Sequence, residues 1–351
     1  MIRLEHLSVE AGAFRLTDLS LEIDAGRWAI LLGPAGAGKT TLLETIAGVR
    51  AVTSGRVLLR GVDATRAPAE SRGAAIVYQQ GFLFPHLSVS DNIMYGARDA
   101  AYAAHIATRF GADALRARPV HALSGGERQL VALVRALAPR PDIVLLDEPF
   151  SALDPRTRSR VRRELQALHR EERLTVLQVT HDFVEAGTVG DLALLMERGR
   201  LAQVAPPEQL FRHPATASAA EFLGAENIYA GSVSRRNPGP AGGLDTLAFQ
   251  AGALHLVAVG TRGDGPAHAI VRGEDVALSH DDDAVPMASA RNVLAGTVTE
   301  LMTNGVITRV TIDVRGEPLV SIITTTAARD LALHLGMTVV ASIKATAVHL
   351  C

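Results

Sequence analysis

The chain has 351 residues, of which 48% are hydrophobic, so two or three domains with large cores are possible. Its 35 Lys and Arg residues against 37 Asp and Glu residues leave a net charge of −2, which argues against a dedicated nucleic-acid-binding protein. A single cysteine, Cys351, excludes an internal disulfide and a cysteine-rich zinc site. Because charged residues stand near the N-terminus and no apolar run approaches the ~18 residues of a membrane helix, we expect neither a signal peptide nor a membrane helix. We therefore expect a soluble chain that reaches a membrane only through partners.

Residues 1–225 alternate short apolar runs with helical patterns, which predicts an α/β domain. Residues 28–32, 143–146 and 175–179 have the length and composition of buried strands. Residues 130–137 carry leucines and valine at helical spacing, which predicts an amphipathic helix.

A glycine-rich segment follows the first buried strand and matches the phosphate-binding pattern G-x-x-x-x-G-K-[ST]. It consists of Gly33, Pro34, Ala35, Gly36, Ala37, Gly38, Lys39 and Thr40, with Thr41 next. Its backbone N–H groups and the helix that begins at Lys39 are suited to hold phosphates. We expect Lys39 to contact the β- and γ-phosphates and Thr40 to ligate Mg²⁺, which makes ATP and Mg²⁺ the predicted ligands. A glycine-rich turn without a ligand does not account for the flanking strand and helix.

The strand at residues 143–146 leads directly into Asp147 and Glu148. Downstream of a P-loop, Asp147 is expected to hold Mg²⁺ through water, and Glu148 to polarise the water that attacks the γ-phosphate. An apolar run that ends in two acidic residues is common, so this assignment depends on the P-loop before it.

The string Leu123-Ser124-Gly125-Gly126-Glu127-Arg128-Gln129 closely resembles the signature motif of ABC transporter ATPases. The resemblance implies that Ser124, Gly125 and Gly126 bind the γ-phosphate of ATP held by a second chain. It therefore implies a homodimer with two ATP molecules between its subunits. Apart from this family, Ser124 is also a good helix N-cap, which explains the serine but not the whole string.

Other motifs of this family follow in the expected order over residues 1–225. Gln79 matches the glutamine that contacts Mg²⁺ and the attacking water, and His181 matches the switch histidine at the γ-phosphate. Residues 151–154 resemble the loop at the dimer interface, although Asp154 before a proline is also a helix N-cap. The aromatic residue that stacks on adenine is missing, because its position falls near Ala11. Phe14 is the candidate to replace it.

Residues 82–89 and 206–214 resemble segments of importer ATPases that dock on a membrane subunit and lead into an accessory domain. The resemblance implies two integral membrane permease subunits and an extracytoplasmic substrate-binding protein as partners. It also implies a peripheral position at the cytoplasmic face of the membrane. The arginine-rich residues 156–173 are interpreted as a solvated helix face, because Leu165 and Leu168 fall at helical spacing.

After residue 225 the pattern becomes strand-like. Residues 226–288 are predicted to form a linker and the first part of an accessory β domain, and residues 289–351 a small β-barrel with turns at 304–305 and 315–316. No long internal repeat is visible. The predicted fold class is thus α/β, a P-loop NTPase with a RecA-like core and a helical subdomain, followed by a small all-β OB-like barrel.

Two strings near the ends of residues 289–351 resemble the oxyanion-binding (TOBE/Mop-like) barrel of molybdate proteins. They are Ser289, Ala290, Arg291 and Asn292, and Lys344, Ala345 and Thr346. The resemblance implies that backbone N–H groups, hydroxyls and Lys344 hold molybdate or tungstate where two barrels meet. The alternative is a barrel that only extends the dimer interface. Residues 271–274 support an accessory domain of this kind but no particular substrate.

Four functions stay open at this point. The first is the ATPase of a molybdate or tungstate importer with feedback inhibition through the barrel, and the second is the ATPase of a sulfate, iron(III) or polyamine importer. A soluble ABC ATPase acting on DNA or ribosomes is disfavoured by the linker and barrel. A non-catalytic oxyanion store or sensor is disfavoured by the intact Lys39, Asp147, Glu148 and His181.

Overall fold

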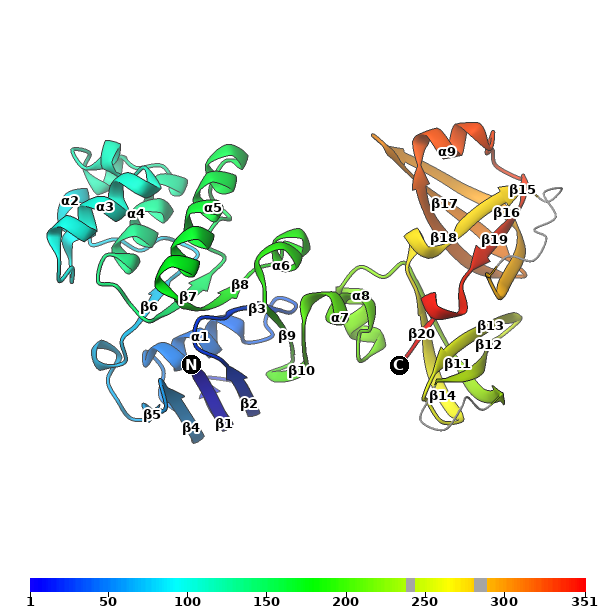
Figure 1. Ribbon diagram of the computed structural model, residues 1–351, viewed down its shortest axis with the longest axis horizontal. Helices are drawn as coiled ribbons and strands as arrows, with labels where there is room; N and C mark the ends of the chain where they lie inside the picture. The colour runs from blue at the N-terminus through cyan, green and yellow to red at the C-terminus, as the bar shows by residue number, and fades with distance from the viewer. Residues whose placement is uncertain (238–243, 281–288) are drawn as a thin grey trace. The chain divides into compact units, whose positions relative to one another are not determined.

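The computed structural model describes residues 1–237, 244–280 and 289–351. They divide into two compact units, Met1–Leu210 and Phe211–Cys351 (Figure 1). The first unit has a four-stranded antiparallel sheet of order β2-β1-β4-β5, formed by β1 (Ile2–Ala11), β2 (Phe14–Ile23), β4 (Ser54–Leu59) and β5 (Val62–Asp63). Its second sheet has the order β10-β9-β3-β8-β7-β6, formed by β3 (Trp28–Leu32), β6 (Ala74–Val77), β7 (Ile143–Asp147), β8 (Thr175–Val179), β9 (Leu192–Glu197) and β10 (Arg200–Ala205). This sheet is parallel except for the pair β9–β10.

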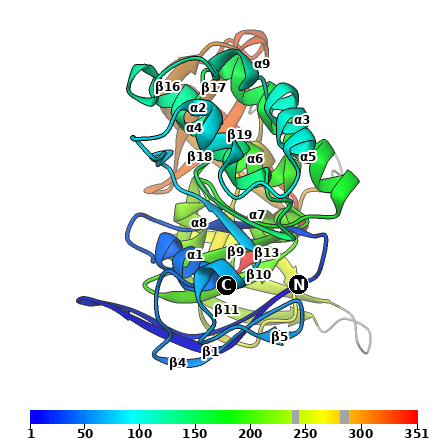
Figure 2. The ribbon, with the colours of Figure 1, turned by 90° about the vertical axis from the view of Figure 1, so that its left-hand side faces the viewer.

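The helices that begin in the first unit are α1 (Lys39–Ala47), α2 (Val89–Met94), α3 (Ala100–Phe110), α4 (Gly125–Leu137), α5 (Pro155–Glu172), α6 (Phe183–Val189) and α7 (Pro207–Arg212). Helices α2, α3 and α4 pack together as a helical subdomain, on the side of this unit away from the four-stranded sheet (Figure 2). Within the described ranges, no helix is long and apolar enough to cross a membrane.

The predicted buried strands are confirmed, because every residue of β3, β7 and β8 is buried. The predicted helix after the P-loop is α1, and Gly48 caps its end with a left-handed φ of 86°. The arginine-rich stretch is α5, whose buried residues Val161, Leu165 and Leu168 leave the arginines on its outer faces.

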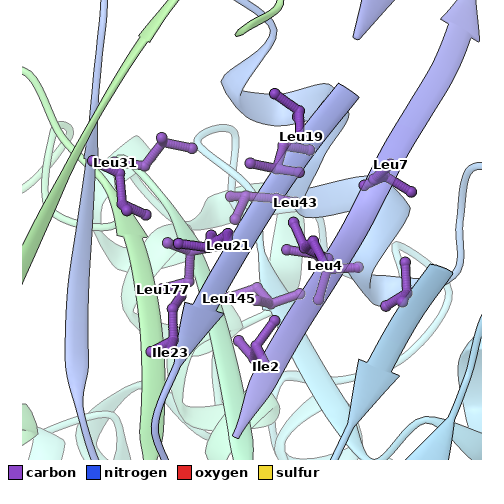
Figure 3. Packing of buried hydrophobic residues seen from close by; sticks show 14 of the residues in the cluster. Ile2, Leu4, Leu7, Leu19, Leu21, Ile23, Leu31, Leu43, Leu145 and Leu177 are labelled. Atoms are coloured by element: carbon purple, nitrogen blue, oxygen red, sulfur yellow. The ribbon is translucent and has the colours of Figure 1, made fainter. Parts of the chain in front are cut away.

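One hydrophobic core joins both sheets of the first unit to α1 (Figure 3). Leucine and isoleucine side chains of β1 and β2 point toward Leu43 of α1 and toward Leu31, Leu145 and Leu177 of the six-stranded sheet. Because these side chains are buried, α1 is held between the sheets with its N-terminus at the end of β3.

The second unit contains two antiparallel five-stranded sheets with a shared core. The order β13-β12-β11-β14-β20 is formed by β11 (Asn227–Asn237), β12 (Asp245–Ala251), β13 (Leu254–Gly260), β14 (Gly265–Val271) and β20 (His349–Leu350). The order β15-β19-β16-β17-β18 is formed by β15 (Ala277–His280), β16 (Asn292–Asn304), β17 (Ile307–Val314), β18 (Glu317–Thr324) and β19 (Thr338–Ile343). Two short helices, α8 (Ala217–Phe222) and α9 (Thr325–Asp330), complete this unit.

These two sheets repeat one topology, although the sequence shows no long repeat. The succession β11–β14 corresponds to β16–β19, with the first strand of each set in the interior of its sheet. A 3₁₀ turn follows each set, at Gly273–Asp275 and at Ala345–Ala347. The last strand of each half then crosses to the other sheet, since β15 pairs with β19 and β20 pairs with β14. Each half therefore completes the sheet of the other.

Two buried asparagines stand at equivalent places, the first residues of β11 and β16, and link the halves. The Asn292 side chain donates to the Val257 carbonyl at 2.9 Å and accepts from the Val257 N–H. The Asn227 side chain donates to the Val320 carbonyl at 2.9 Å and accepts from the Val320 N–H at 2.7 Å. Each asparagine thus replaces a pair of backbone hydrogen bonds between strands of different sheets.

The boundary between the units falls at Leu210, upstream of residue 225, where the sequence placed the end of the ATP-binding domain. Arg272 gives the physical reason. Its guanidinium donates to the carbonyls of Leu223 at 3.1 Å and Phe211 at 2.7 Å, which ties the segment around α8 to the β sheets.

Replacing Asn292 by alanine should destabilise the second unit by about 3 kcal/mol, because it removes a buried side chain and leaves the N–H and carbonyl groups of Val257 in β13 without their partner. We expect a lower thermal unfolding midpoint for Asn292→Ala in calorimetry of the full chain. Gln250→Ala, on the exposed face of β12, is the control that should unfold like the unsubstituted chain. An unchanged midpoint for Asn292→Ala would contradict this role.

Candidate nucleotide-binding site

The glycine-rich loop connects β3 to α1 and needs glycine where the backbone turns. Gly33 has φ 151° and Gly38 has φ 100°. A Cβ on Gly33 would lie 2.2 Å from the Met196 carbonyl oxygen, and one on Gly38 would lie 2.6 Å from the Phe14 ring. The loop therefore stays close to β9 and β2, in a backbone conformation that glycine adopts without strain.

An open cavity of about 570 Å³ lies over this loop. It is lined by Ala11, Phe14, Ala35, Gly36, Gly38, Lys39, Thr40, Thr41, Arg50, Gln79, Asp147 and Glu148. Segments far apart in the sequence thus meet at one place. Phe14 and Ala11, the two positions considered for adenine contact, both line this cavity.

Lys39 lies over the loop that precedes it. Its ammonium group donates to the carbonyls of Gly33 at 2.7 Å and Pro34 at 3.0 Å. Burial lowers the pKa of Lys39, while the nearby Glu148 and Asp147 carboxylates act in the opposite direction. The lysine is therefore a partly desolvated cation at the edge of the phosphate cradle.

Thr40 and Asp147 form the second feature of the cavity. The Thr40 hydroxyl donates to Asp147 Oδ2 at 2.6 Å. Burial raises the pKa of Asp147, and the hydrogen bond from Thr40 partly offsets this effect. A hydroxyl, a carboxylate and the carboxamide oxygen of Gln79 are hard oxygen donors of the kind that Mg²⁺ prefers, so this set fits the metal.

Glu148 stands between two further side chains that the sequence singled out. Gln79 Nε2 donates to Glu148 Oε2 at 3.0 Å, and His181 Nδ1 lies 3.2 Å from Glu148 Oε1. The His181 side chain is 73% exposed and that of Glu148 only 20%, so the carboxylate is set back from the surface. The segments that follow β6, β7 and β8 thus each contribute one side chain to a single cluster.

The signature residues lie at the start of α4. The Ser124 hydroxyl accepts from the Glu127 N–H at 3.2 Å, and the Glu127 carboxylate accepts from the Ser124 N–H at 2.8 Å. This reciprocal cap explains why the helix begins here. None of Ser124, Gly125 and Gly126 is among the described residues that line the cavity over the P-loop.

Sequence reasoning did not assign a role to Gln129, a residue of α4 that is only 1% exposed. Its side-chain amide donates to the Glu148 carbonyl at 2.8 Å and accepts from the Ala152 N–H at 3.1 Å. One signal was available in the sequence, because Gln129 falls on the apolar face of a helix, and a buried amide needs hydrogen-bond partners.

The two strings considered for oxyanion binding lie side by side in the second unit, because Asn292 of β16 pairs with Ile343 of β19. Arg291 and Lys344 are exposed, as are the hydroxyl residues Ser289 and Thr346. Ala290 is half-buried and Ala345 buried. The Asn292 side chain is occupied by its bonds to other strands, so it is committed to the fold.

Comparison with known proteins gives matches over both units. The family model "ABC transporter" matches residues 16–151, and the model "TOBE domain" matches residues 288–350. The chain is 35% identical to the molybdate/tungstate import ATP-binding protein of Pyrococcus horikoshii, over 99% of each protein. It is 38% identical to the sulfate/thiosulfate import ATP-binding protein of Burkholderia pseudomallei, over 95% of each. The Fe(3+) ions import ATP-binding protein of Brucella abortus is 36% identical, over 79% of this chain and 80% of that protein.

A solved structure is similar to the first unit. It is a dimeric ATP-binding cassette in a post-hydrolysis state bound to ADP and Pi, with a TM-score of 0.54 and 26% identity. The match covers 59% of this chain and 99% of the other.

Replacing Asp147 by asparagine should stabilise the nucleotide-free chain near pH 8. The raised pKa of Asp147 means that its charged form is disfavoured in the folded state, and asparagine is neutral but still accepts the bond from Thr40. As the pH falls through the raised pKa of Asp147, the wild-type carboxyl takes up a proton, and the difference between the two chains should shrink until it vanishes below the ordinary pKa of an aspartate.

Thermal unfolding from about pH 3 to pH 8, a range that extends below the ordinary aspartate pKa of about 3.9, measures this difference. Asp24→Asn, at an exposed position of the same unit, is the control and should show no such gain. A less stable Asp147→Asn chain at pH 8 would refute the proposed cost of the buried charge.

Proposed function

The chain belongs to the ABC transporter ATPases of the importer type and hydrolyses ATP, and from this premise we propose that it energises uptake of an oxyanion, molybdate or tungstate. One observation carries the ATPase mechanism proposed here. A single cavity brings the P-loop together with the Thr40–Asp147 pair, and its carboxylate Glu148 contacts both Gln79 and His181.

Residues 33–41 hold the phosphates of ATP through backbone N–H groups, and Lys39 exchanges its bonds to the loop carbonyls for the β- and γ-phosphates. Thr40, Asp147 and Gln79 hold Mg²⁺, which neutralises charge on the phosphates when it is bound. Phe14 supplies the apolar surface for the adenine ring in place of the missing aromatic residue.

Glu148 orients the attacking water and accepts its proton, because its carboxylate is only 20% exposed and the residue lines the same cavity as the P-loop. Gln79 fixes one oxygen of this carboxylate through its amide. His181, more exposed and next to the other oxygen, stabilises charge that develops on the γ-phosphate.

The functional unit is a homodimer with head-to-tail sites. Ser124, Gly125 and Gly126 lie at the N-terminus of α4, a good anion-binding position, yet they do not line their own chain's cavity. They therefore act on the ATP of the partner chain. The similarity to a cassette solved as a dimer supports this arrangement.

Two integral membrane permease subunits dock on the homodimer, one on each chain, in the groove between the helical subdomain and β6. This groove has a volume of about 880 Å³, and Phe84, Tyr95 and Arg135 contribute to its lining. Tyr95 is 57% exposed, and so is the nearby Phe82 at 56%, which suits a surface that a partner covers. The chain is accordingly peripheral at the cytoplasmic face of the membrane, and an extracytoplasmic substrate-binding protein delivers the cargo.

Relatives named for the import of molybdate/tungstate and of sulfate/thiosulfate support an oxyanion as the cargo. A relative named for the import of Fe(3+) ions leaves a metal cation as the alternative cargo. Within the chain, Arg291 and Lys344 place two cations beside the hydroxyl residues Ser289 and Thr346. Such a set suits a tetrahedral dianion. Oxyanion bound there inhibits the ATPase and so limits uptake.

Glu148→Gln should keep ATP binding but lower kcat by about 10²- to 10⁴-fold, because the amide cannot accept the proton. The substituted chain should then form a stable dimer with ATP in size-exclusion chromatography. Lys39→Ala is the contrasting variant, which should lose ATP binding and show no such dimer. Near-normal turnover by Glu148→Gln would remove Glu148 from the role of general base.

Molybdate and tungstate should bind the purified chain in titration calorimetry and raise its unfolding temperature by mass action. Lys344→Ala should abolish this binding, whereas Arg329→Ala, at an exposed position on α9, should leave it unchanged. Binding of sulfate alone would favour the sulfate alternative. Absence of binding by all three anions would refute the regulatory site and leave the ATPase mechanism intact.

A further inference from the structure

Gln129 joins three segments that serve the nucleotide site. Its Nε2 donates to the Glu148 carbonyl at 2.8 Å and lies 3.4 Å from the Gln79 carbonyl. Its Oε1 accepts from the Ala152 N–H at 3.1 Å. One buried amide on α4 therefore contacts the backbone of the segments after β6 and β7 at the same time.

Two glycine positions show that these segments pack directly on the first turns of α4. A Cβ on Gly81 would lie 2.9 Å from the Cα and N atoms of Gln129. A Cβ on Gly126 would lie 2.7 Å from the Ala152 carbonyl oxygen. There is no room for a side chain at either contact, so a shift of α4 would displace both segments.

The backbone at Glu148 has an unusual conformation that its surroundings must hold. Its φ is +46°, in the left-handed region, which is uncommon for a residue with a side chain. The Glu148 N–H donates to the Val179 carbonyl at 3.1 Å, and the Glu148 carbonyl accepts from Ser151 as well as from Gln129. The Ser151 bonds span only three residues, whereas the bond from Gln129 anchors this peptide to a helix.

We infer that Gln129 is a positioning residue for hydrolysis, which sets the direction of the Glu148 carboxylate by fixing the peptide unit that follows it. This inference rests on the proposed role of Glu148 as general base. Gln129 itself lines neither the cavity over the P-loop nor, among the described residues, the smaller one beside His181. Its effect on the reaction therefore passes through the backbone of Glu148.

A purely structural role makes different predictions. A buried amide that only satisfies hydrogen bonds affects the stability of the fold and, through it, the fraction of active protein. A positioning residue instead lowers kcat in molecules that are folded and bind ATP normally. The two roles are separated by measuring kcat, KM and the unfolding temperature on the same preparation.

Gln129→Met keeps the length of the side chain and removes its hydrogen bonds. We expect kcat to fall on the order of tenfold to hundredfold, with the KM for ATP changed by less than about threefold. Gln166→Met, at a half-buried position of α5, is the matched control and should keep the full rate. If Gln129→Met does not fold, Gln129→Glu serves instead, because it still accepts from Ala152 but sets a carboxylate against the Glu148 carbonyl.

A double-mutant cycle with Glu148→Gln tests the route of the effect. If Gln129 acts through Glu148, then Gln129→Met should lower the residual rate of the Glu148→Gln chain by less than about twofold. The inference is overturned if it lowers that residual rate as much as it lowers the wild-type rate, or if Gln129→Met alone turns over normally. Unimpaired turnover by Glu148→Gln would instead overturn the proposed mechanism, so the two failures are distinguishable.

Discussion

The burial of α1 between two sheets is the constraint on which the nucleotide site depends. Backbone N–H groups hold phosphates only if the loop before the helix is fixed, and the core around Leu43 fixes it. Both ends of α1 are secured as well. At the N-terminal end the Phe14 ring packs on Gly38. At the other end the buried Arg72 donates to the carbonyls of Thr45 at 2.8 Å and Ile46 at 3.0 Å, where a cation suits the negative end of the helix.

The charged side chains of the cavity lower the folding stability of the nucleotide-free chain. Burial disfavours the charged forms of both Lys39 and Asp147, and Glu148 stands beside Asp147 as a like charge. Each of these groups has a partner within the chain, since Lys39 bonds loop carbonyls, Asp147 bonds Thr40 and Glu148 bonds Gln79. Phosphates and a divalent cation would provide stronger partners for the same groups, so ligand binding would exchange these contacts for stronger ones.

Much of the first unit was predictable from the sequence, because its candidate functional residues lie in short contiguous motifs. The loop before Lys39, the strand before Asp147 and the cap at Ser124 each combine a short motif with its own secondary structure. The exchanged halves of the second unit were not predictable in this way. Their equivalence lies in strand order and in the paired asparagines Asn227 and Asn292, which depend on tertiary pairing. The limit of the first unit at Leu210 was also hidden, because it depends on the distant Arg272.

The exchange of strands gives the second unit a property that a simple barrel lacks. Lys344 and Thr346 follow β19, and the chain then crosses to form β20 in the other sheet. Arg291 directly precedes β16, whose first residue, Asn292, is tied to β13 of the other sheet. Lys344 thus stands where the chain crosses from one sheet to the other, and Arg291 stands where the second half begins. A ligand that draws these segments together acts on both sheets at once, because neither sheet is complete without a strand from the other half.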